Sequence, residues 1–229
     1  MRGIVTTIPK RMLVRGLVEP VVLGATLFLL AGTLDFWQAW VLLAVAALST
    51  SIPTAYLART NPVALERRQS AGPTAETRAV QKVSMAGWWL SLAGMIIVGA
   101  LNRRFDWSQI PVAVCLIGDV LVAAGLILGM LVLIQNSHAA ATVRVEQGQE
   151  VIAAGFYGLV RHPMYTGNVL IMVGLPLALG SYWGLVFVVP GLIVLALRIR
   201  DEEKLLRAEL AGYAEYAEKV RYRLVPYMW

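Results

Sequence analysis

The polar residues that could carry out chemistry are concentrated in two short stretches of an otherwise apolar chain. Residues 155–167 read GFYGLVRHPMYTG, and residues 198–203 read RIRDEE. Arg161 can bind a carboxylate through two parallel hydrogen bonds, and Glu202 and Glu203 can accept hydrogen bonds from an ammonium. Tyr157 and Tyr165 add aromatic faces that suit a base or a sulfonium. Together the two stretches suit a zwitterionic ligand.

The composition indicates an integral membrane protein. Of the 229 residues, 58% are hydrophobic and 15% are charged, and the mean hydropathy is +0.67. Soluble domains carry about 25% charged residues, so a soluble enzyme is excluded. The single Cys and two His exclude a disulfide framework and a Cys/His zinc cluster, and no metal site is expected. The net charge is +6, and the basic residues that produce it lie between the apolar runs. This placement is typical of membrane topology rather than of nucleic-acid binding.

Four apolar runs are each long enough to cross a bilayer as a helix: residues 16–33, 37–56, 85–101 and 110–134. The first is expected to be a retained anchor, because it is longer than the apolar part of a signal peptide. A fifth region, 168–197, contains Pro176, a turn-like GSYWG and Pro190, and we expect a helical hairpin that is either re-entrant or fully spanning. One tilted, kinked helix is the alternative.

The basic residues predict the orientation. Of the 20 Lys and Arg residues, 18 fall in the N-terminus, residues 57–84, residues 135–167 and the tail from 198, and only Arg103 and Arg104 fall on the other side. The positive-inside rule therefore places the N-terminus and the two polar stretches in the cytosol. Aromatic residues mark the expected outer boundary: Trp37, Trp40, Trp107, Tyr182 and Trp183.

These features predict an all-α fold, a polytopic membrane helical bundle with about five to six membrane segments. Residues 1–134 form four transmembrane helices, and residues 135–229 form a catalytic region with the polar loop, the hairpin and a cytosolic amphipathic C-terminal helix, broken near Gly212. If 168–197 is a hairpin, its two ends meet at one surface, so the two polar stretches form one site.

A resemblance rests on Val143-Arg-Val145, on residues 155–167, and on DEEKLL at 201–206 with Gly212-Tyr213 and Tyr216. This pattern resembles the isoprenylcysteine carboxyl methyltransferase family, one of a wider group of integral-membrane methyltransferases that includes the phospholipid N-methyltransferases. It covers residues 135–226. Phe156 departs from it, since the family often has Pro before the Tyr.

The resemblance implies S-adenosylmethionine as the methyl donor, in a cytosolic pocket, and a lipidated cysteine carboxylate that enters from the bilayer as the acceptor. Arg161 and Glu203 are the implied catalytic residues. The implied donor-binding residues are Asn136, Tyr157, Val160, Arg161, His162, Pro163, Tyr165, Glu202 and Glu203. Membrane lipids are the other expected partners, with no nucleic acid.

Such chemistry needs few residues. A carboxylate acceptor is already ionised at pH 7 and needs no general base, so alignment and exclusion of water would suffice. An amine acceptor would first have to lose a proton, for which His162 and the two Glu are the nearby candidates. An amine headgroup, a small thiol or a prenylated small molecule are alternative acceptors.

Two other functions stay open. Membrane sterol reductases resemble this C-terminal architecture but use a nicotinamide cofactor, and their corresponding element resembles Arg-x-x-Asn-Tyr rather than Arg161-His-Pro-Met-Tyr165. A non-enzymatic lipid-binding protein is the remaining alternative. The sequence does not specify the acceptor or the oligomeric state.

Isolated polar and small residues inside the apolar runs have structural interpretations as well. Glu19 is expected to pair with Arg15 four residues earlier, and His138 to end a span. Asp119 has no partner nearby in the sequence, so it is expected either to bond a neighbouring helix or to be functional. Gly125-x-x-x-Gly129 suits close helix packing or dimerisation.

Overall fold

The computed structural model describes residues 10–63, 65, 76, 78–136 and 149–229, and side chains from Val18 onward. Within these residues the chain folds into seven α-helices and two short 3-10 helices with no strand, which confirms the predicted helical membrane bundle. The α-helices are α1 (Lys10–Ala31), α2 (Trp37–Thr60), α4 (Ala79–Phe105), α5 (Val112–Gln135), α6 (Pro163–Ala178), α7 (Val188–Glu209) and α8 (Tyr213–Lys219); the 3-10 helices are η1 (Gly155–Gly158) and η2 (Trp183–Phe187). The side chain of Arg15, His138 and the 143–145 stretch lie outside this description.

In the part of the chain that the structure describes, four helices are long and apolar enough to cross a membrane: Trp37–Thr60, Ala79–Phe105, Val112–Gln135 and the continuous segment Trp183–Glu209. The first three coincide with predicted runs. The apolar part of α1 with described side chains, Val18–Ala31, is shorter, as is α6. Large apolar side chains on these helices point outward, with Leu29, Ile52 and Leu90 each more than 70% exposed, as expected for surfaces that face lipid.

The region 168–197 reverses direction between two helices. After α6 the chain turns through residues 179–182, where Gly180 has φ +72°, and continues as η2 and α7. Asn102 of α4 donates hydrogen bonds to the carbonyls of Gly180 and Ser108, at 2.9 Å each, which satisfies the buried backbone of this turn. The turn is thereby fixed to the end of α4.

Helices α5 and α6 pack backbone against backbone through glycines. A Cβ atom on Gly125 would lie 2.4 Å from the Gly167 carbonyl oxygen, and one on Gly118 would lie 2.7 Å from the Gly174 oxygen. Each helix therefore presents two glycines spaced by seven residues, on one face. The Gly125-x-x-x-Gly129 pair serves the close helix packing that was one of its two predicted roles, because a Cβ added at Gly167 would lie 2.7 Å from the Gly125 oxygen and 3.6 Å from the Gly129 nitrogen. A Cβ added at Gly129 itself would meet no described atom within 4 Å.

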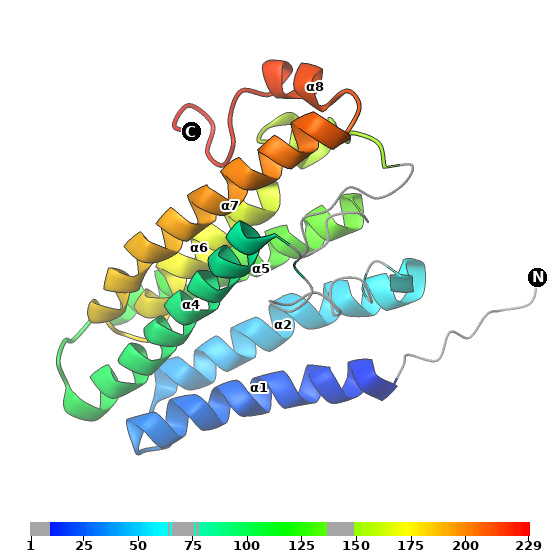
Figure 1. Ribbon diagram of the computed structural model, residues 1–229. Coiled ribbons are helices and arrows are strands. Elements are labelled where there is room, and N and C mark those ends of the chain that lie inside the picture. Colours follow the sequence, from blue (N-terminus) through cyan, green and yellow to red (C-terminus); the bar gives the residue numbers. More distant parts are fainter. Residues whose placement is uncertain (1–9, 64, 66–75, 77, 137–148) are drawn as a thin grey trace, which may run out of the picture.

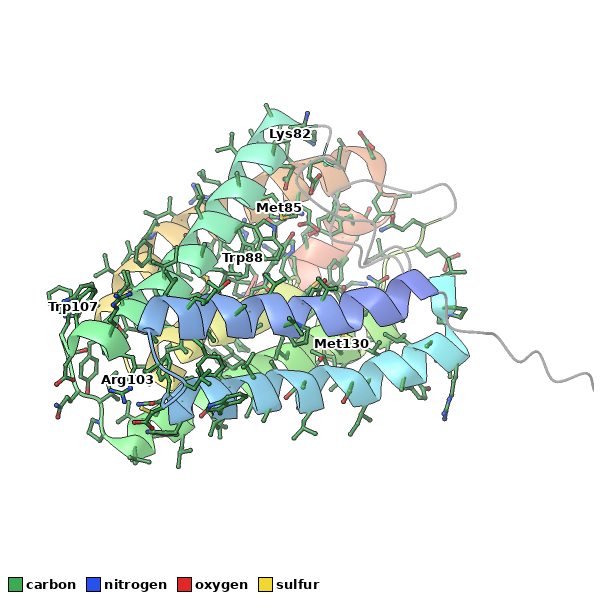
Figure 2. The ribbon with its side chains drawn as sticks, turned by 90° about the horizontal axis from the view of Figure 1, so that it is seen from below. Lys82, Met85, Trp88, Arg103, Trp107 and Met130 are labelled. Carbon is green, nitrogen blue, oxygen red and sulfur yellow. The ribbon has the colours of Figure 1, made fainter. Side chains whose placement is uncertain are left out.

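Successive long helices run in opposite directions, so alternate ends gather at two poles (Figure 1). The starts of α4 and α6, the end of α7, and α8 meet at one pole, which we call the polar end. Arg103 and Trp107 lie together at the opposite end, where α1 turns into α2 (Figure 2). The predicted aromatic boundary residues Trp40, Trp107 and Trp183 are about half exposed.

The tail is built on α7. This helix leaves the apolar part of the bundle, ends at Glu209, and is separated from α8 by a break in which Gly212 has φ +81°. Leu210, Tyr213, Tyr216 and Ala217 form a small buried cluster with Val151, Tyr157, Leu206 and Val220 around them. The cluster attaches α8 to the loop before α6 and so closes the polar end.

Candidate functional site

The loop that contains Arg161, His162 and Pro163 is held by the tail that follows α8. Pro163 is the first residue of α6, a position where its missing N–H would have no helical partner. The backbone N–H groups of Arg161 and His162 donate to the carbonyls of Tyr222 and Arg223, each at 2.9 Å. The loop is therefore hydrogen-bonded to the tail through its backbone.

Glu203 is the hub of a buried charge cluster. Its Oε1 accepts from Arg161 Nε at 2.7 Å and lies 3.2 Å from His162 Nε2, and its Oε2 accepts from Arg223 Nε at 3.0 Å. Arg161, His162 and Glu203 are each no more than 6% exposed. A buried carboxylate needs such partners, because an isolated charge away from water is costly.

The Arg161 side chain also donates hydrogen bonds to backbone carbonyls at the end of α8 and in the tail that follows it. Its Nη1 donates to the carbonyls of Ala217, Val220 and Arg221 at 3.2, 2.7 and 3.0 Å. These carbonyls lie at the end of α8, where the last turn leaves oxygens without helical donors. The guanidinium is thus directed at the protein's own carboxylate and backbone.

Tyr165 centres a second cluster. Its hydroxyl donates to Glu202 Oε2 at 2.6 Å and accepts from Arg198 Nε at 2.9 Å. Arg198 in turn donates from Nη2 to Glu76 Oε1 at 2.8 Å. The Tyr165 ring stacks on His162, with centroids 5.6 Å apart and planes 18° apart, which connects this cluster to the one on Glu203.

The three consecutive acids of α7 serve three different parts of the chain. Successive residues on an α-helix point about 100° apart. Asp201 pairs with Arg78 at 2.6 Å and accepts from Gln81 at 2.6 Å, Glu202 faces Tyr165, and Glu203 faces Arg161. One turn of α7 therefore joins the start of α4, the start of α6 and the loop before α6.

A third group lies at the end of α5. Asn136, directly after the helix, donates from Nδ2 to the Tyr157 hydroxyl at 3.1 Å. Gln135 bonds the Ala154 carbonyl and the Phe156 N–H, and Gly155 has φ +58° with no room for a Cβ beside Gln135. The end of α5 therefore fixes η1.

The phenols around this group are neutral. Burial raises the pKa of Tyr157 to about 12, and burial also raises the pKa values of Tyr213 and Tyr216. The Tyr216 hydroxyl donates to the Tyr157 carbonyl at 2.7 Å. At neutral pH these side chains can donate hydrogen bonds but carry no charge.

The predicted site residues divide into two sets by exposure. Val160, Arg161, His162, Pro163 and Glu203 are buried, whereas Asn136, Tyr157, Tyr165 and Glu202 are half-buried. The buried set forms a frame that joins loop, helix and tail. The half-buried set is the part that a ligand can reach, and Glu202 is the acid in it.

The structure adds residues that the sequence patterns did not single out as part of the site. Glu76, Gln81 and Arg223 all contact the acids or Arg198 on α7. Arg223 lies in the tail after α8, and Glu76 lies in a polar stretch of sequence without periodicity. No sequence signal distinguishes them from other surface charges.

Two apolar grooves lie in the membrane part of the bundle. One, of about 400 Å³, runs between α1 and α4 and includes Glu19 and Thr26. The other is lined by Val98, Trp107, Trp183, Val186 and Phe187. Neither includes a residue of the Glu203 or Tyr165 clusters.

Part of the chain, including much of the candidate site, is similar to a known protein family. Residues 114–211 match the family model of phospholipid methyltransferase. All the predicted donor-site residues, from Asn136 to Glu203, fall inside this match. The match supports a membrane methyltransferase of the wider integral-membrane group that the sequence resembles, without distinguishing the isoprenylcysteine branch.

A curated relative is similar over part of the chain. Delta(14)-sterol reductase TM7SF2 of Mus musculus is 30% identical over 91 residues, which is 38% of this chain and 22% of that protein. The alignment thus spans about a fifth of the relative's length.

Proposed function

We propose that this protein is a membrane-embedded methyltransferase that uses S-adenosylmethionine to methylate a lipophilic acceptor. The observation that carries the proposal is that the phospholipid methyltransferase match, residues 114–211, includes every donor-binding residue expected from the sequence, from Asn136 to Glu203. The reversal between α6 and α7 brings the Arg161 loop against Glu202 and Glu203, so the matched segment forms one polar surface.

The residues present fit the proposed donor. S-adenosylmethionine supplies a methyl group on a sulfonium and carries an ammonium and a carboxylate beside it. The charge of Glu203 is already balanced by Arg161 and Arg223, and His162 lies beside it. Glu202 is half-buried and accepts one hydrogen bond from the neutral Tyr165 hydroxyl, so its negative charge can meet a cationic group.

Tyr157 and Asn136 offer the neutral part of the proposed pocket. The Tyr157 hydroxyl and the Asn136 amide are hydrogen-bonded to each other at the end of α5. Because the Tyr157 pKa is about 12, the ring stays uncharged and can face a sulfonium through its π system or stack on a base.

The chain's contribution to the reaction would be alignment and exclusion of water. The Arg161 frame fixes the loop against α7, which fixes Tyr165 and Glu202 in one orientation. A carboxylate acceptor needs no base, so an isoprenylcysteine carboxylate is our first candidate. A lipid amine, a small thiol or a prenylated small molecule is the alternative, and an amine would need His162 or a Glu as base.

The positive-inside asymmetry leads us to propose that the polar end, and with it the donor pocket, faces the cytosol. The acceptor would then enter from the bilayer, and membrane lipids would surround the apolar faces of α2, α4 and α7.

A reductase is the second candidate function, because the curated relative is named a sterol reductase. That function would require a nicotinamide cofactor at the same polar end. The two candidates differ in the ligand they bind.

The deciding experiment is calorimetric binding of S-adenosylmethionine, S-adenosylhomocysteine and NADPH to detergent-purified protein. We expect micromolar binding of the two adenosyl ligands, weakened about tenfold by Glu202→Gln through loss of a charge-assisted hydrogen bond. Glu209→Gln, an exposed acid on the same helix, is the control and should bind normally. Binding of NADPH with no adenosyl binding would replace the proposal with the reductase.

The acceptor can be identified by the bond that forms. Methyl-labelled donor is incubated with N-acetyl-S-farnesylcysteine, with phosphatidylethanolamine vesicles or with a small thiol. A carboxyl methyl ester releases labelled methanol in base, whereas N-methyl and S-methyl products keep the label. Base-labile label with the farnesylcysteine would support the isoprenylcysteine assignment, and base-stable label in the vesicles would assign an amine instead.

A further inference from the structure

Glu76 forms a buried ion pair with Arg198 although the two residues are 122 positions apart. Glu76 Oε1 accepts from Arg198 Nη2 at 2.8 Å, with side chains 2% and 7% exposed. Glu76 belongs to the segment before α4 and lies outside the 114–211 region that matches the methyltransferase model. The first part of the chain therefore reaches the candidate site, and the Glu76 carboxylate is one of its contacts there.

Arg198 lies between Glu76 and Glu202. Its Nη2 bonds Glu76, and its Nε donates to the Tyr165 hydroxyl, which itself donates to Glu202 Oε2 at 2.6 Å. Glu202 is also four residues after Arg198 on α7, which is the spacing at which side chains of a helix meet. The Tyr165 hydroxyl therefore connects Arg198 to Glu202, the half-buried acid of the site.

The segment that carries Glu76 is fixed by further contacts. Arg78 pairs with Asp201 at 2.6 Å, and Gln81 Nε2 donates to Asp201 Oδ2 and to the Arg198 carbonyl at 2.6 and 3.3 Å. Gln81 is fully buried. The position of Glu76 is therefore set from the same turn of α7 that carries Glu202.

A buried guanidinium requires a carboxylate partner, since an uncompensated charge inside a protein is strongly unfavourable. Among the described residues, Glu76 apart, Glu202 is the acid linked to Arg198, through the Tyr165 hydroxyl and the four-residue spacing on α7. Pairing with Arg198 would neutralise Glu202 and remove its attraction for a cationic ligand group. Glu76 therefore controls the charge that Glu202 presents.

We propose that Glu76 is a positioning residue of the ligand site: it holds Arg198 so that Glu202 keeps its charge for the ammonium group of the bound adenosyl ligand. The inference rests on the proposed function, because it assumes that an amino-acid ammonium binds beside Glu202. It assigns a role in the site to a residue outside the region similar to known methyltransferases.

The test is a double-mutant cycle on S-adenosylhomocysteine binding, measured by calorimetry in detergent. Glu76→Gln and Glu202→Gln should each weaken binding about tenfold, and the double variant should also be only about tenfold weaker, because both changes remove the same Glu202 charge from the ligand. Glu209→Gln serves as the matched control. A double variant about a hundredfold weaker would show independent effects and overturn the inference, as would unchanged binding by either single variant.

A rescue variant separates positioning from folding. Glu76→Gln combined with Arg198→Gln removes both buried charges, so no guanidinium competes for Glu202, and binding should return to within about threefold of the unmodified protein. A merely structural role would leave this double variant as weak as Glu76→Gln or weaker, and the inference would fail. If the unmodified protein binds no adenosyl ligand, the proposed function fails first.

Discussion

The membrane part and the polar end of this molecule are held together in different ways. Helices α5 and α6 meet through Gly118, Gly125, Gly167 and Gly174, where the two backbones approach each other closely. The polar end instead joins residues 76–81, 136, 157–165, 198–203 and 217–223 through ion pairs and hydrogen bonds. Helices gain no hydrophobic free energy by associating within lipid, because the lipid tails are as apolar as their side chains. Close backbone packing therefore holds the membrane part together, and ion pairs and hydrogen bonds hold the polar end together.

This difference predicts two kinds of variant. A substitution in the glycine contact between α5 and α6 should lower the stability of the protein. It should not change the preference of the site for a cationic ligand group. A change in the half-buried polar residues should alter ligand affinity more than stability. Variants of the buried frame should do both, and they are expected to have the largest effects.

Glu203→Gln should have the largest effect on stability. It leaves Arg161 and Arg223 beside a neutral group in a buried cluster, and breaking a buried ion pair costs about 3–5 kcal/mol. The free energy of unfolding in detergent measures this loss. Glu209→Gln should stay within about 0.5 kcal/mol, as expected for an exposed position. Equal stabilities of the two variants would contradict the role of Glu203 as the hub.

Gly125→Ala should come next. The added methyl would lie 2.4 Å from the Gly167 oxygen, so α5 and α6 must separate, at a cost of about 1–3 kcal/mol. Gly129→Ala, one turn later, is the matched control and should be nearly neutral, because its added methyl would meet no described atom within 4 Å. The measurement is the melting temperature in detergent, and a similar melting temperature for both variants would argue against the glycine contact.

Tyr165→Phe should have a smaller effect on stability and a clear one on affinity. The hydroxyl bridges Arg198 and Glu202, and its loss removes two hydrogen bonds worth about 1 kcal/mol each. We expect S-adenosylhomocysteine affinity to fall about tenfold as Glu202 loses its fixed orientation. Calorimetry tests this directly. If the Tyr165→Phe variant is less stable but binds S-adenosylhomocysteine with wild-type affinity, then Tyr165 belongs to the buried frame and not to the ligand site.

Asp119→Asn should have the smallest effect on ligand binding. Asp119 is 4% exposed on α5, and its two carboxylate oxygens have no hydrogen-bond partner among the described residues. It lies several turns of helix before Asn136, so we expect unchanged adenosyl affinity. The same calorimetric titration measures it. A tenfold loss would mean that the membrane part contributes to the site, which would end the separation of the two regions.

The helices were the most predictable part of this structure. The apolar runs of α2, α4 and α5 are as long as the bilayer is thick, so they could be located from the sequence. Helix α6 differs, because it begins at Pro163, inside the stretch expected to be a loop and before the predicted hairpin at 168–197. The contact between the Arg161 loop and the acids of α7 also followed from the sequence, because a reversal within 168–197 returns the chain to the same end.

The side-chain directions were not predictable. Whether Glu202 or Glu203 is the buried hub depends on the rotation of α7 about its axis, which is set by packing against α4 and α6. The glycines of α5 suggested dimerisation as readily as internal packing until their neighbours were known. Glu76 and Arg223 come from segments without periodicity, so only the folded chain brings them to α7.

The hydrogen bonds from Arg161 to the carbonyls of Ala217, Val220 and Arg221 impose an order of assembly on the protein. The spanning helices α2, α4 and α5 can be inserted as they are synthesised, but the Arg161 loop acquires its partners only after residue 223 has been made. Until then Glu203 and Arg161 lack Arg223 and the α8 carbonyls. During biosynthesis, the bundle therefore exists in the membrane before its polar end can close.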